Sequence, residues 1–249
     1  MVVVGTTLLG LAVGSFLNVV LHRVPVGGSV VSPASSCTRC GRGILRRDNV
    51  PIVSFVLLRG RCRGCAGRIP ARYPLVEGLT GTLFAAAAIR FDGGGQLLLA
   101  LALISVSVTL AATDLHHRLL PNSIVVPAGI AGFVLAAAVD PRSWWLHPLA
   151  ALVVGGFLLA LAAVYRGGMG MGDVKMGGML GLFLGPYAAL AVFIGALFGT
   201  VLYSALAPFG VLGRQSALPF GTFMAFGALV ALFAGPELWG LYLNLAGVS

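Results

Sequence analysis

Long apolar runs alternate with short polar breaks along most of this 249-residue chain. Most of the runs are close to the roughly 20 residues that an α-helix needs to cross a bilayer. The pattern predicts an all-α polytopic transmembrane bundle of about eight spans, of which the sixth is short. The predicted spans are residues 1–22, 74–91, 96–113, 119–139, 147–165, 174–186, 188–207 and 219–245.

The same pattern divides the chain into three parts. Residues 1–22 are the first transmembrane helix, residues 23–73 are a polar loop, and residues 74–249 hold the remaining spans. We call residues 23–73 the cysteine loop. Arginines follow the first run and no basic segment precedes it, which is the reverse of a cleavable signal peptide. We therefore interpret the first run as a membrane helix whose N-terminus lies outside.

The basic residues test this orientation. With the N-terminus outside, the cytoplasmic loops hold 14 of the 16 Lys and Arg residues, ten of them in the cysteine loop. An excess of basic residues in cytoplasmic loops is the usual arrangement in membrane proteins. The loops that this topology makes cytoplasmic are residues 23–73, 114–118, 166–175 and 208–218.

Composition narrows the function classes. Hydrophobic residues make up 58% of the chain and charged residues only 9%, whereas about a quarter of a soluble domain is charged. The net charge of +9 could indicate nucleic-acid binding. The arginines, however, form no long amphipathic or aromatic-interleaved run. We therefore expect the basic loops to interact with the lipid bilayer, whose anionic headgroups attract cytoplasmic loops. We do not expect the protein to bind nucleic acid.

Two of the seven acidic residues, Asp114 and Asp173, lie where predicted spans meet the cytoplasmic face. Two carboxylates that lie close together hold one proton between them and titrate as a unit. One can then take a proton from water while the other gives one to a leaving amine. This favours peptide hydrolysis by an aspartic dyad. A proton-coupled transporter that uses the same carboxylates, and simple helix capping by Asp173, remain alternatives.

Glycines surround the second of these aspartates. Gly170 and Gly172 precede it, where they permit close approach of an extended substrate. Gly177, Gly181 and Gly185 follow it at steps of four and share one helix face. Such a face lets a neighbouring helix pack closely.

Four cysteines form two CxxC pairs, both in the cysteine loop. Four thiolates can hold one Zn²⁺ tetrahedrally, and the spacing of the pairs is close to that of known zinc sites. A cytoplasmic location disfavours disulfides. The pattern predicts a structural zinc site; a thioredoxin-like redox pair is the alternative. The proposed ligands are Cys37, Cys40, Cys62 and Cys65.

Six segments in order resemble the type IV prepilin peptidases, membrane aspartic proteases of the GxGD class. The GxGD motif itself corresponds to Gly170–Asp173, and Asp114 precedes an "LP" turn as the family's other catalytic aspartate does. The remaining resemblance is carried by "GSFLNVVLHRVP", "DNVPIVSFVLLRGRCRGC", "IPARYPLVEGLTG" and "LPFGTFMAFGA".

The resemblance implies a bifunctional enzyme of the bacterial inner membrane with its active site facing the cytoplasm. It would cut the basic leader from type IV prepilin or pseudopilin precursors. It would then N-methylate the new N-terminus with S-adenosylmethionine as donor. Pro219, Phe220 and Gly221 would help to shape the cleft, and Glu77 either pairs with an arginine or belongs to the methyl-transfer site. The chain departs from the family in having "CTRC" for Cys-Pro-x-Cys, and Asn122 where an aspartate often follows the "LP" turn.

Overall fold

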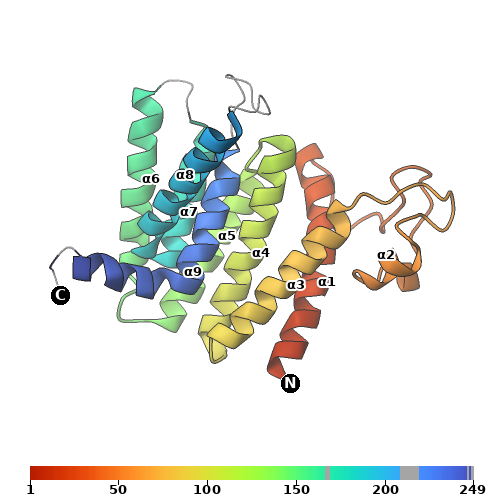
Figure 1. Ribbon diagram of the computed structural model, residues 1–249, viewed down its shortest axis with the longest axis horizontal. Coiled ribbons are helices and arrows are strands. Elements are labelled where there is room, and N and C mark those ends of the chain that lie inside the picture. The colour runs from red at the N-terminus through yellow and green to blue at the C-terminus, as the bar shows by residue number, and fades with distance from the viewer. Residues whose placement is uncertain (166–168, 208–218, 246, 248–249) are drawn as a thin grey trace. The chain divides into compact units, whose positions relative to one another are not determined.

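The computed structural model describes residues 1–165, 169–207, 219–245 and 247. Over these residues the regular elements are helices, accompanied by two isolated β-bridges (Figure 1). The chain divides into two compact units, Met1–Asp92 and Gly93–Ser249. The predicted all-α fold is confirmed. Arg166 and Arg214, two basic residues of the predicted cytoplasmic loops, lie outside the described residues.

The first unit is a helix pair joined by the cysteine loop. α1 (Val2–Arg23) packs along α3 (Arg72–Arg90). A Cβ at Gly14 would lie 2.7 Å from the Cα of Glu77, so the absence of a side chain lets the two backbones approach closely. The loop between them contains three short helical segments, η1 (Val24–Val26), η2 (Arg46–Asp48) and α2 (Val53–Leu57).

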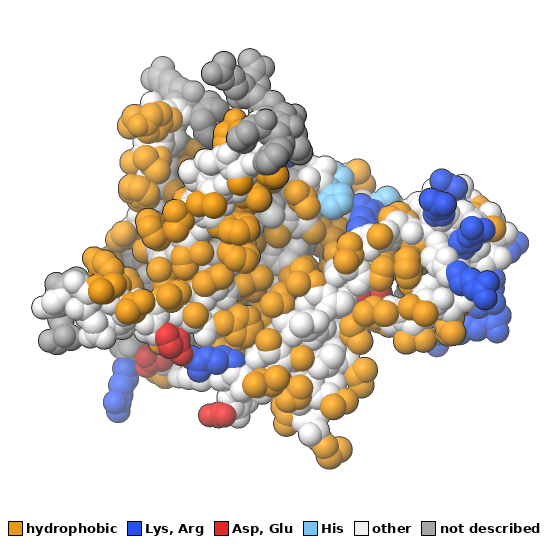
Figure 2. All heavy atoms as spheres, in the orientation of Figure 1, with side chains coloured by type: hydrophobic (Ala, Val, Ile, Leu, Met, Phe, Trp, Pro, Cys, Tyr) orange, Lys and Arg blue, Asp and Glu red, His pale blue; other side chains and the backbone are white. Residues whose placement is uncertain are grey.

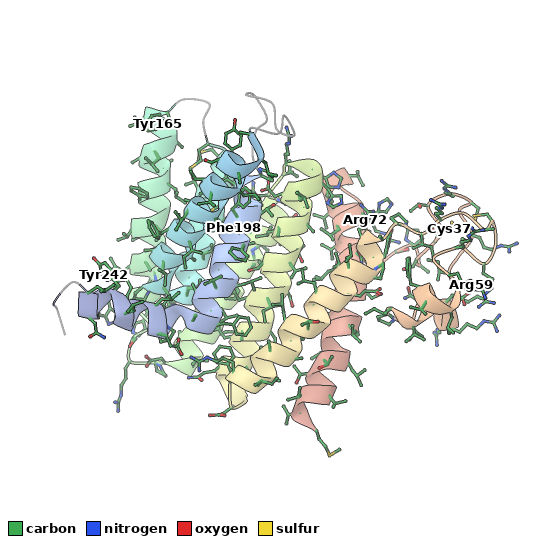
Figure 3. The ribbon with its side chains drawn as sticks, in the orientation of Figure 1. Cys37, Arg59, Arg72, Tyr165, Phe198 and Tyr242 are labelled. Atoms are coloured by element: carbon green, nitrogen blue, oxygen red, sulfur yellow. The ribbon has the colours of Figure 1, made fainter. Side chains whose placement is uncertain are left out.

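The second unit is a helix bundle organised around α7. α7 packs against α5, α6, α8 and α9, and its Met176 and Leu180 have no solvent exposure. Phe198 of α8 stacks on Phe226 of α9 with 4.5 Å between ring centroids (Figure 3). The helices of this unit are α4 (Gly94–His117), α5 (Asn122–Val139), α6 (Leu146–Val164), α7 (Met171–Leu184), α8 (Tyr187–Leu206) and α9 (Phe220–Leu245).

The predicted glycine face of α7 lies against α6. A Cβ at Gly177 would collide with Leu158, and one at Gly181 would collide with the backbone of Ala151. Both contacts therefore depend on glycine, as expected for closely packed membrane helices. α6 carries no acidic residue, so a second carboxylate has to reach the start of α7 from another helix.

Each of the eight predicted spans contains a helix, but the helices are not equivalent. Six of those in the described residues are long and apolar enough to cross a membrane: α1, α4, α5, α6, α8 and α9. α3 and α7 are not among them. The 14 residues of α7 rise only about 21 Å, against a hydrocarbon core of roughly 30 Å. Hydrophobic side chains cover much of the visible surface of the helices in Figure 2. The protein is a multi-pass membrane protein.

Candidate functional site

Asp114 lies in the last turn of α4 and is only 6% exposed. Its Oδ2 accepts the backbone N–H of Thr222 at 2.9 Å, and the Thr222 hydroxyl lies 3.4 Å from the same oxygen. Thr222 belongs to the first turn of α9, where N–H groups have no partner within the helix. Asp114 therefore caps the N-terminus of α9, and Thr222 in turn fixes the orientation of the carboxylate.

Gly221 leaves room for this cap. A Cβ at this position would lie 3.0 Å from the Asp114 Oδ2 and 3.0 Å from Leu120. Pro219 precedes α9 and Phe220 opens it, and both are partly exposed. The predicted segment Pro219–Gly221 thus forms the start of α9 and leaves space beside Asp114.

Asp173 is the third residue of α7. Its Oδ2 accepts the Gly170 N–H at 3.3 Å, while its own N–H donates to the Gly170 carbonyl oxygen at 3.1 Å. These two reciprocal hydrogen bonds resemble a capping box, except that the Gly170 backbone takes the place of the usual N-cap side chain. It holds the carboxylate at the N-terminus of α7.

The two GxGD glycines differ in what surrounds them. A Cβ at Gly172 would lie 3.1 Å from the Leu120 Cβ, which is tighter than ordinary contact. A Cβ at Gly170 would meet only the Asp173 Oδ2 at 3.5 Å and the Gly172 nitrogen at 3.9 Å. Packing against Leu120 therefore disfavours a side chain at position 172, whereas position 170 has room for one.

Leu120 links the two carboxylates. It lies beside Gly172, next to Asp173, and beside Gly221, next to Asp114. The two carboxylates are also within electrostatic range of each other. The fold thus brings together two acids that come from different helices, at one end of the second unit.

The other polar residues near these acids have partners of their own. Lys175 Nζ donates to Asn122 Oδ1 at 3.0 Å, so this lysine is engaged with the start of α5. His116 Nδ1 lies 3.0 Å from the Ala112 carbonyl oxygen, and both His116 and His117 are exposed. Within the described residues, no group of metal-ligating side chains forms around Asp114.

The four cysteines of the cysteine loop converge. All four Sγ atoms lie within 4.8 Å of one another, and those of Cys37 and Cys65 are 3.9 Å apart. A tetrahedral site with metal–sulfur bonds of about 2.3 Å places its sulfurs about 3.8 Å apart. Backbone N–H groups of Cys40 and Arg39 lower the pKa of Cys37 to about 6, whereas hydrogen bonds with the other cysteines, together with burial, raise the pKa of Cys65 to about 11. A bound metal ion would favour the thiolate form of these cysteines. The cluster fits one metal ion.

The two CxxC turns have the same backbone structure. In the first, the Cys37 N–H donates to the Arg42 carbonyl oxygen at 2.9 Å; in the second, the Cys62 N–H donates to the Gly67 carbonyl oxygen at 2.8 Å. An isolated antiparallel bridge flanks each turn. The loop therefore presents two copies of one local structure, each offering two sulfurs to a shared centre.

Charged residues lie on the surface of the cysteine loop, and one ion pair connects two parts of it. Arginine side chains gather on it in Figure 2, and Figure 3 labels Arg59 and Cys37 on it. Arg63 forms a bidentate pair with Asp48, with N–O distances of 2.9 and 2.8 Å. The hydrogen bonds from Arg63 lower the pKa of the Asp48 carboxyl group. This pair ties η2 to the second CxxC turn.

Comparisons with known proteins give matches in both units of the chain. The bacterial peptidase A24 N-terminal domain matches residues 8–91, and the type IV leader peptidase family matches residues 101–205. A prepilin leader peptidase/N-methyltransferase of Bacillus subtilis is 35% identical over 95% of this chain and 96% of its own. The chain belongs to the type IV leader peptidase family.

Two further relatives carry the same name. That of Myxococcus xanthus is 44% identical over 75% of this chain and 57% of its own length. That of Burkholderia pseudomallei strain 1026b is 34% identical over 96% of this chain and 86% of its own. No solved structure matches.

Glu77 lies within the stretch matched by the family's N-terminal domain and is 7% exposed. Its Oε2 accepts the backbone N–H of Ile52 at 2.8 Å, and the Ser15 hydroxyl interacts with the same carboxyl group. The predicted arginine partner is not found among the described residues. Ile52 has φ of 59°, which is rare for a β-branched residue. Glu77 thus holds a strained turn of the cysteine loop against the helix pair.

Two residues of the aspartate site, Thr222 and Leu120, were not predicted from the sequence. Thr222 hydrogen-bonds to Asp114, and Leu120 lies beside Gly172 and Gly221, which neighbour the two acids. Both sets of contacts arise only through tertiary packing. Thr222 lies directly after the Pro-Phe-Gly segment, and a threonine at a helix start is a capping signal. Leu120 is the leucine of the "LP" turn that carries part of the family resemblance, but the motif gives no role for its side chain.

Proposed function

We propose that this protein is a membrane aspartic endopeptidase in which Asp114 and Asp173 activate one water molecule. The main observation behind the proposal is that Asp114 lies at the N-terminus of α9 and Asp173 at the N-terminus of α7, on either side of Leu120. Family membership supports the same reaction. The relatives named above are peptidases by name, which favours proteolysis over proton-coupled transport.

The chemistry follows from the arrangement of the two carboxylates. Held in electrostatic range, they share one proton. One takes a proton from the attacking water as the other donates a proton to the departing amine. Thr222 fixes Asp114 and the Gly170 backbone fixes Asp173, so neither side chain has to reorient before reaction.

The test replaces each acid singly by Asn, which keeps the side-chain shape. Asp114→Asn and Asp173→Asn, purified in detergent, are incubated with a prepilin-like precursor, and the product is identified by mass spectrometry. Each variant should lose cleavage by at least roughly 10³-fold, as expected when a member of a catalytic group is removed.

Asp140→Asn is the matched control. This exposed aspartate accepts the Arg142 N–H at a turn outside the helices, so cleavage should be retained. Robust cleavage by either dyad variant would show that the acids do not act together.

The substrates in this proposal are type IV prepilins or pseudopilins, inserted in the bacterial inner membrane. The N-terminus lies outside and the aspartates face the cytoplasm, as the distribution of basic residues indicates. Reporter enzymes fused after Asp92 and after Arg118 should report opposite sides of the membrane. The same side for both would refute this topology.

The second activity in the proposal is N-methylation of the new N-terminus. The names of the relatives support it. S-adenosylmethionine would supply an activated methyl group. The metal of the cysteine cluster is Zn²⁺ with a structural role, because four thiolates are a closed ligand set without an open position for substrate.

A further inference from the structure

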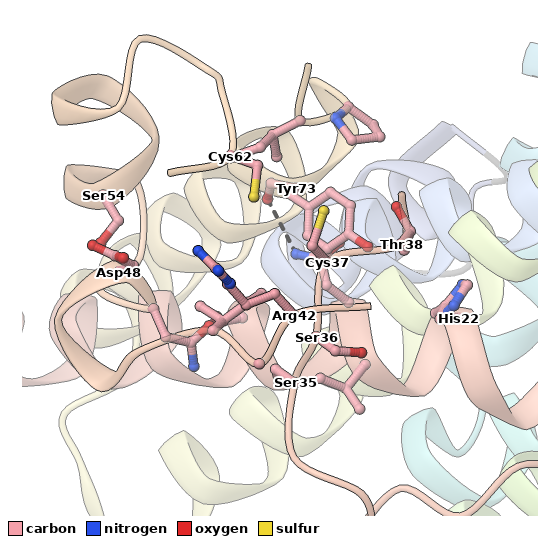
Figure 4. A pocket seen from close by; sticks show the side chains of 18 of the residues that line it. His22, Ser35, Ser36, Cys37, Thr38, Arg42, Asp48, Ser54, Cys62 and Tyr73 are labelled. Carbon is pink, nitrogen blue, oxygen red and sulfur yellow. Dashed lines mark hydrogen bonds between the residues drawn. The ribbon is translucent and has the colours of Figure 1, made fainter. Parts of the chain in front are cut away.

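The first unit contains a cavity of about 720 Å³ between α1, the cysteine loop and the start of α3 (Figure 4). Its lining includes Cys37 and Glu77, so it adjoins the cysteine cluster and the buried carboxylate described above. A feature that neither site uses lies in the second unit, where aromatic side chains gather at the end opposite to the two aspartates. We call it the aromatic end and define it by Trp144, Trp145, Tyr187, Trp239 and Tyr242.

Contacts around the C-terminus of α7 hold the aromatic end together. His147 Nδ1 lies 3.1 Å from the Leu182 carbonyl oxygen, which joins the start of α6, just after the two neighbouring tryptophans, to the end of α7. Tyr187, the first residue of α8, meets Trp239 of α9 edge to face, with 6.5 Å between ring centroids. Asp173 lies at the other end of α7. The length of α7 therefore separates the aromatic end from the aspartates.

All three tryptophans of the chain lie at the aromatic end. Their exposed fractions are 36–52%, so each presents part of its ring outside the protein. Trp and Tyr concentrate where the hydrocarbon core of a bilayer meets its headgroups, because they combine an apolar ring with a polar N–H or O–H group. The turn that contains Asp140 and Arg142 directly precedes two of the tryptophans, as expected where the chain leaves the hydrocarbon core.

The last part of α9 has the form of a segment that lies in a lipid interface. Pro236 lies inside this helix, where it removes a backbone hydrogen bond and favours a kink. In Figure 1 the final part of α9, in the darkest blue, runs crosswise to the earlier part, and Figure 3 labels Tyr242 on it. Tyr242 and Trp239 are both exposed. A crosswise helix with exposed aromatic side chains is suited to the boundary between headgroups and acyl chains.

We propose that the aromatic end binds the lipid headgroup interface on the side opposite to the aspartates, and thereby sets the depth of the two acids in the bilayer. Lipid binding is independent of the proposed peptidase function, whereas the effect on cleavage rests on it. Both acids depend on this anchor, because Asp173 opens α7 and Thr222 of α9 holds Asp114.

The short helices make this depth sensitive to bilayer thickness. α7 rises about 21 Å, and α9 rises about 24 Å between Phe220 and Gly235, the residue before Pro236. Both lengths are below the roughly 30 Å of a typical hydrocarbon core. α6 and α8 are longer, but they carry neither acid. With the aromatic end fixed at one surface, a thin bilayer leaves the dyad at the other surface, whereas a thick bilayer submerges it.

The first test uses the unmodified chain and needs no activity. Because every tryptophan lies at the aromatic end, the intrinsic tryptophan fluorescence reports on this end alone. The full chain is reconstituted in vesicles of phosphatidylglycerol and phosphatidylcholine, and the phosphatidylcholine carries bromine either close to the headgroup or close to the ends of the acyl chains. Shallow bromine should quench the fluorescence more strongly. Stronger quenching by deep bromine, or no quenching by either lipid, would overturn the proposal.

The second test varies the thickness of the bilayer. The unmodified chain and a prepilin-like precursor are reconstituted together in phosphatidylcholine with short, intermediate or long monounsaturated acyl chains, at a constant fraction of phosphatidylglycerol. The cleavage rate should fall roughly fivefold from the thinnest to the thickest bilayer, since each ångström of mismatch has a modest cost. A rate that is independent of thickness, or that rises with it, would contradict the proposed control of depth.

A double variant separates the anchor from the response of the precursor's own membrane segment. Trp239→Ala with Tyr242→Ala should cleave normally in detergent, where no bilayer sets the depth, and should lose most of the dependence on thickness. Phe157→Ala is the matched control, because this exposed aromatic residue lies in the middle of α6 and should leave the dependence unchanged. A double variant that responds to thickness as the unmodified chain does would show that the aromatic end does not set the depth.

The two proposals fail in different ways. If the unmodified chain cuts no precursor in detergent, the peptidase proposal fails, and the quenching pattern still decides whether the aromatic end lies at the headgroups. If cleavage is robust but deep bromine quenches the tryptophans more strongly, the anchor fails and the peptidase proposal stands.

Discussion

The cysteine loop and the helix bundle of the second unit are stabilised by different means. Within residues 23–73, Ser54 is the buried residue, so the loop has almost no apolar core. In the bundle, Met176, Leu180 and Met224 are completely buried, and glycines bring α6 and α7 into backbone contact. The comparison predicts that the loop depends on local hydrogen bonds and on a metal ion held by the four cysteines, whereas the bundle depends on packing.

Removal of the metal should have the largest effect and should separate the two regions. Structural zinc contributes about 10–16 kcal/mol to the folding of zinc-finger peptides. Chelation, or Cys62→Ser, should therefore remove about one zinc per chain and abolish amide hydrogen-exchange protection in the cysteine loop. Protection in α4 to α9 should not change. Because protons compete with the metal for thiolates, metal content should also fall as the pH is lowered.

Ser36→Ala is a suitable control for the cysteine variant. This exposed serine neighbours Cys37 but offers no sulfur, so its replacement should leave the metal bound. A loop that keeps its protection in metal-free protein would show that hydrogen bonds such as the Asp48–Arg63 pair suffice.

Most of the long helices were predictable because length and hydropathy largely determine them; α3 and α7 are less apolar or shorter than a full span. Membrane spans need long apolar runs, and each run in the sequence contains one helix of the structure. The cysteine cluster was predictable for a similar reason, since the spacing within each CxxC pair is local. The convergence of Asp114 and Asp173 followed only indirectly, from the topology indicated by the arginines.

The contacts that complete the sites were not predictable. Thr222 reaches Asp114 from a helix that is distant in sequence, and Leu120 lies between both acids only because α7 and α9 start beside it. The hydrogen bond from Ile52 to Glu77 likewise depends on an unusual backbone angle. These features arise from tertiary packing, which hydropathy does not encode.

The next largest effect concerns packing beside the dyad. Gly172→Ala would force Leu120 to move by a few tenths of an ångström, because the new Cβ would lie 3.1 Å from the Leu120 Cβ. Small misplacements in an active site can reduce rate by up to about 10²-fold. We expect a loss of cleavage of roughly 10- to 100-fold without unfolding of the bundle, measured as kcat/KM on a precursor.

Gly170→Ala tests whether packing against Leu120 causes the loss of cleavage in Gly172→Ala. A Cβ at Gly170 would meet its neighbours at ordinary contact distances, so this variant should lose much less activity than Gly172→Ala. Equal losses would indicate that both glycines contact the substrate directly, as the sequence motif alone suggested.

The smallest expected effect distinguishes the two CxxC turns. Both place a residue in the left-handed region four positions after the first cysteine, Gly41 with φ of 70° and Ala66 with φ of 54°. In the second turn the glycine after Cys65 is Gly67, one residue beyond the position that has the left-handed conformation. A left-handed conformation costs an L-residue about 1–2 kcal/mol, which the flexibility of glycine in the unfolded chain offsets in part.

Ala66→Gly should therefore hold the metal more tightly, by at most about 1 kcal/mol, and Gly41→Ala should weaken retention by a similar amount. Competition with a chromophoric chelator would measure both changes as shifts in metal affinity, each of up to about fivefold. If both substitutions weakened retention, the two turns would not be equivalent. Ala66 would then contribute a contact that its backbone angle does not reveal, and the loop would owe part of its stability to packing, as the bundle does.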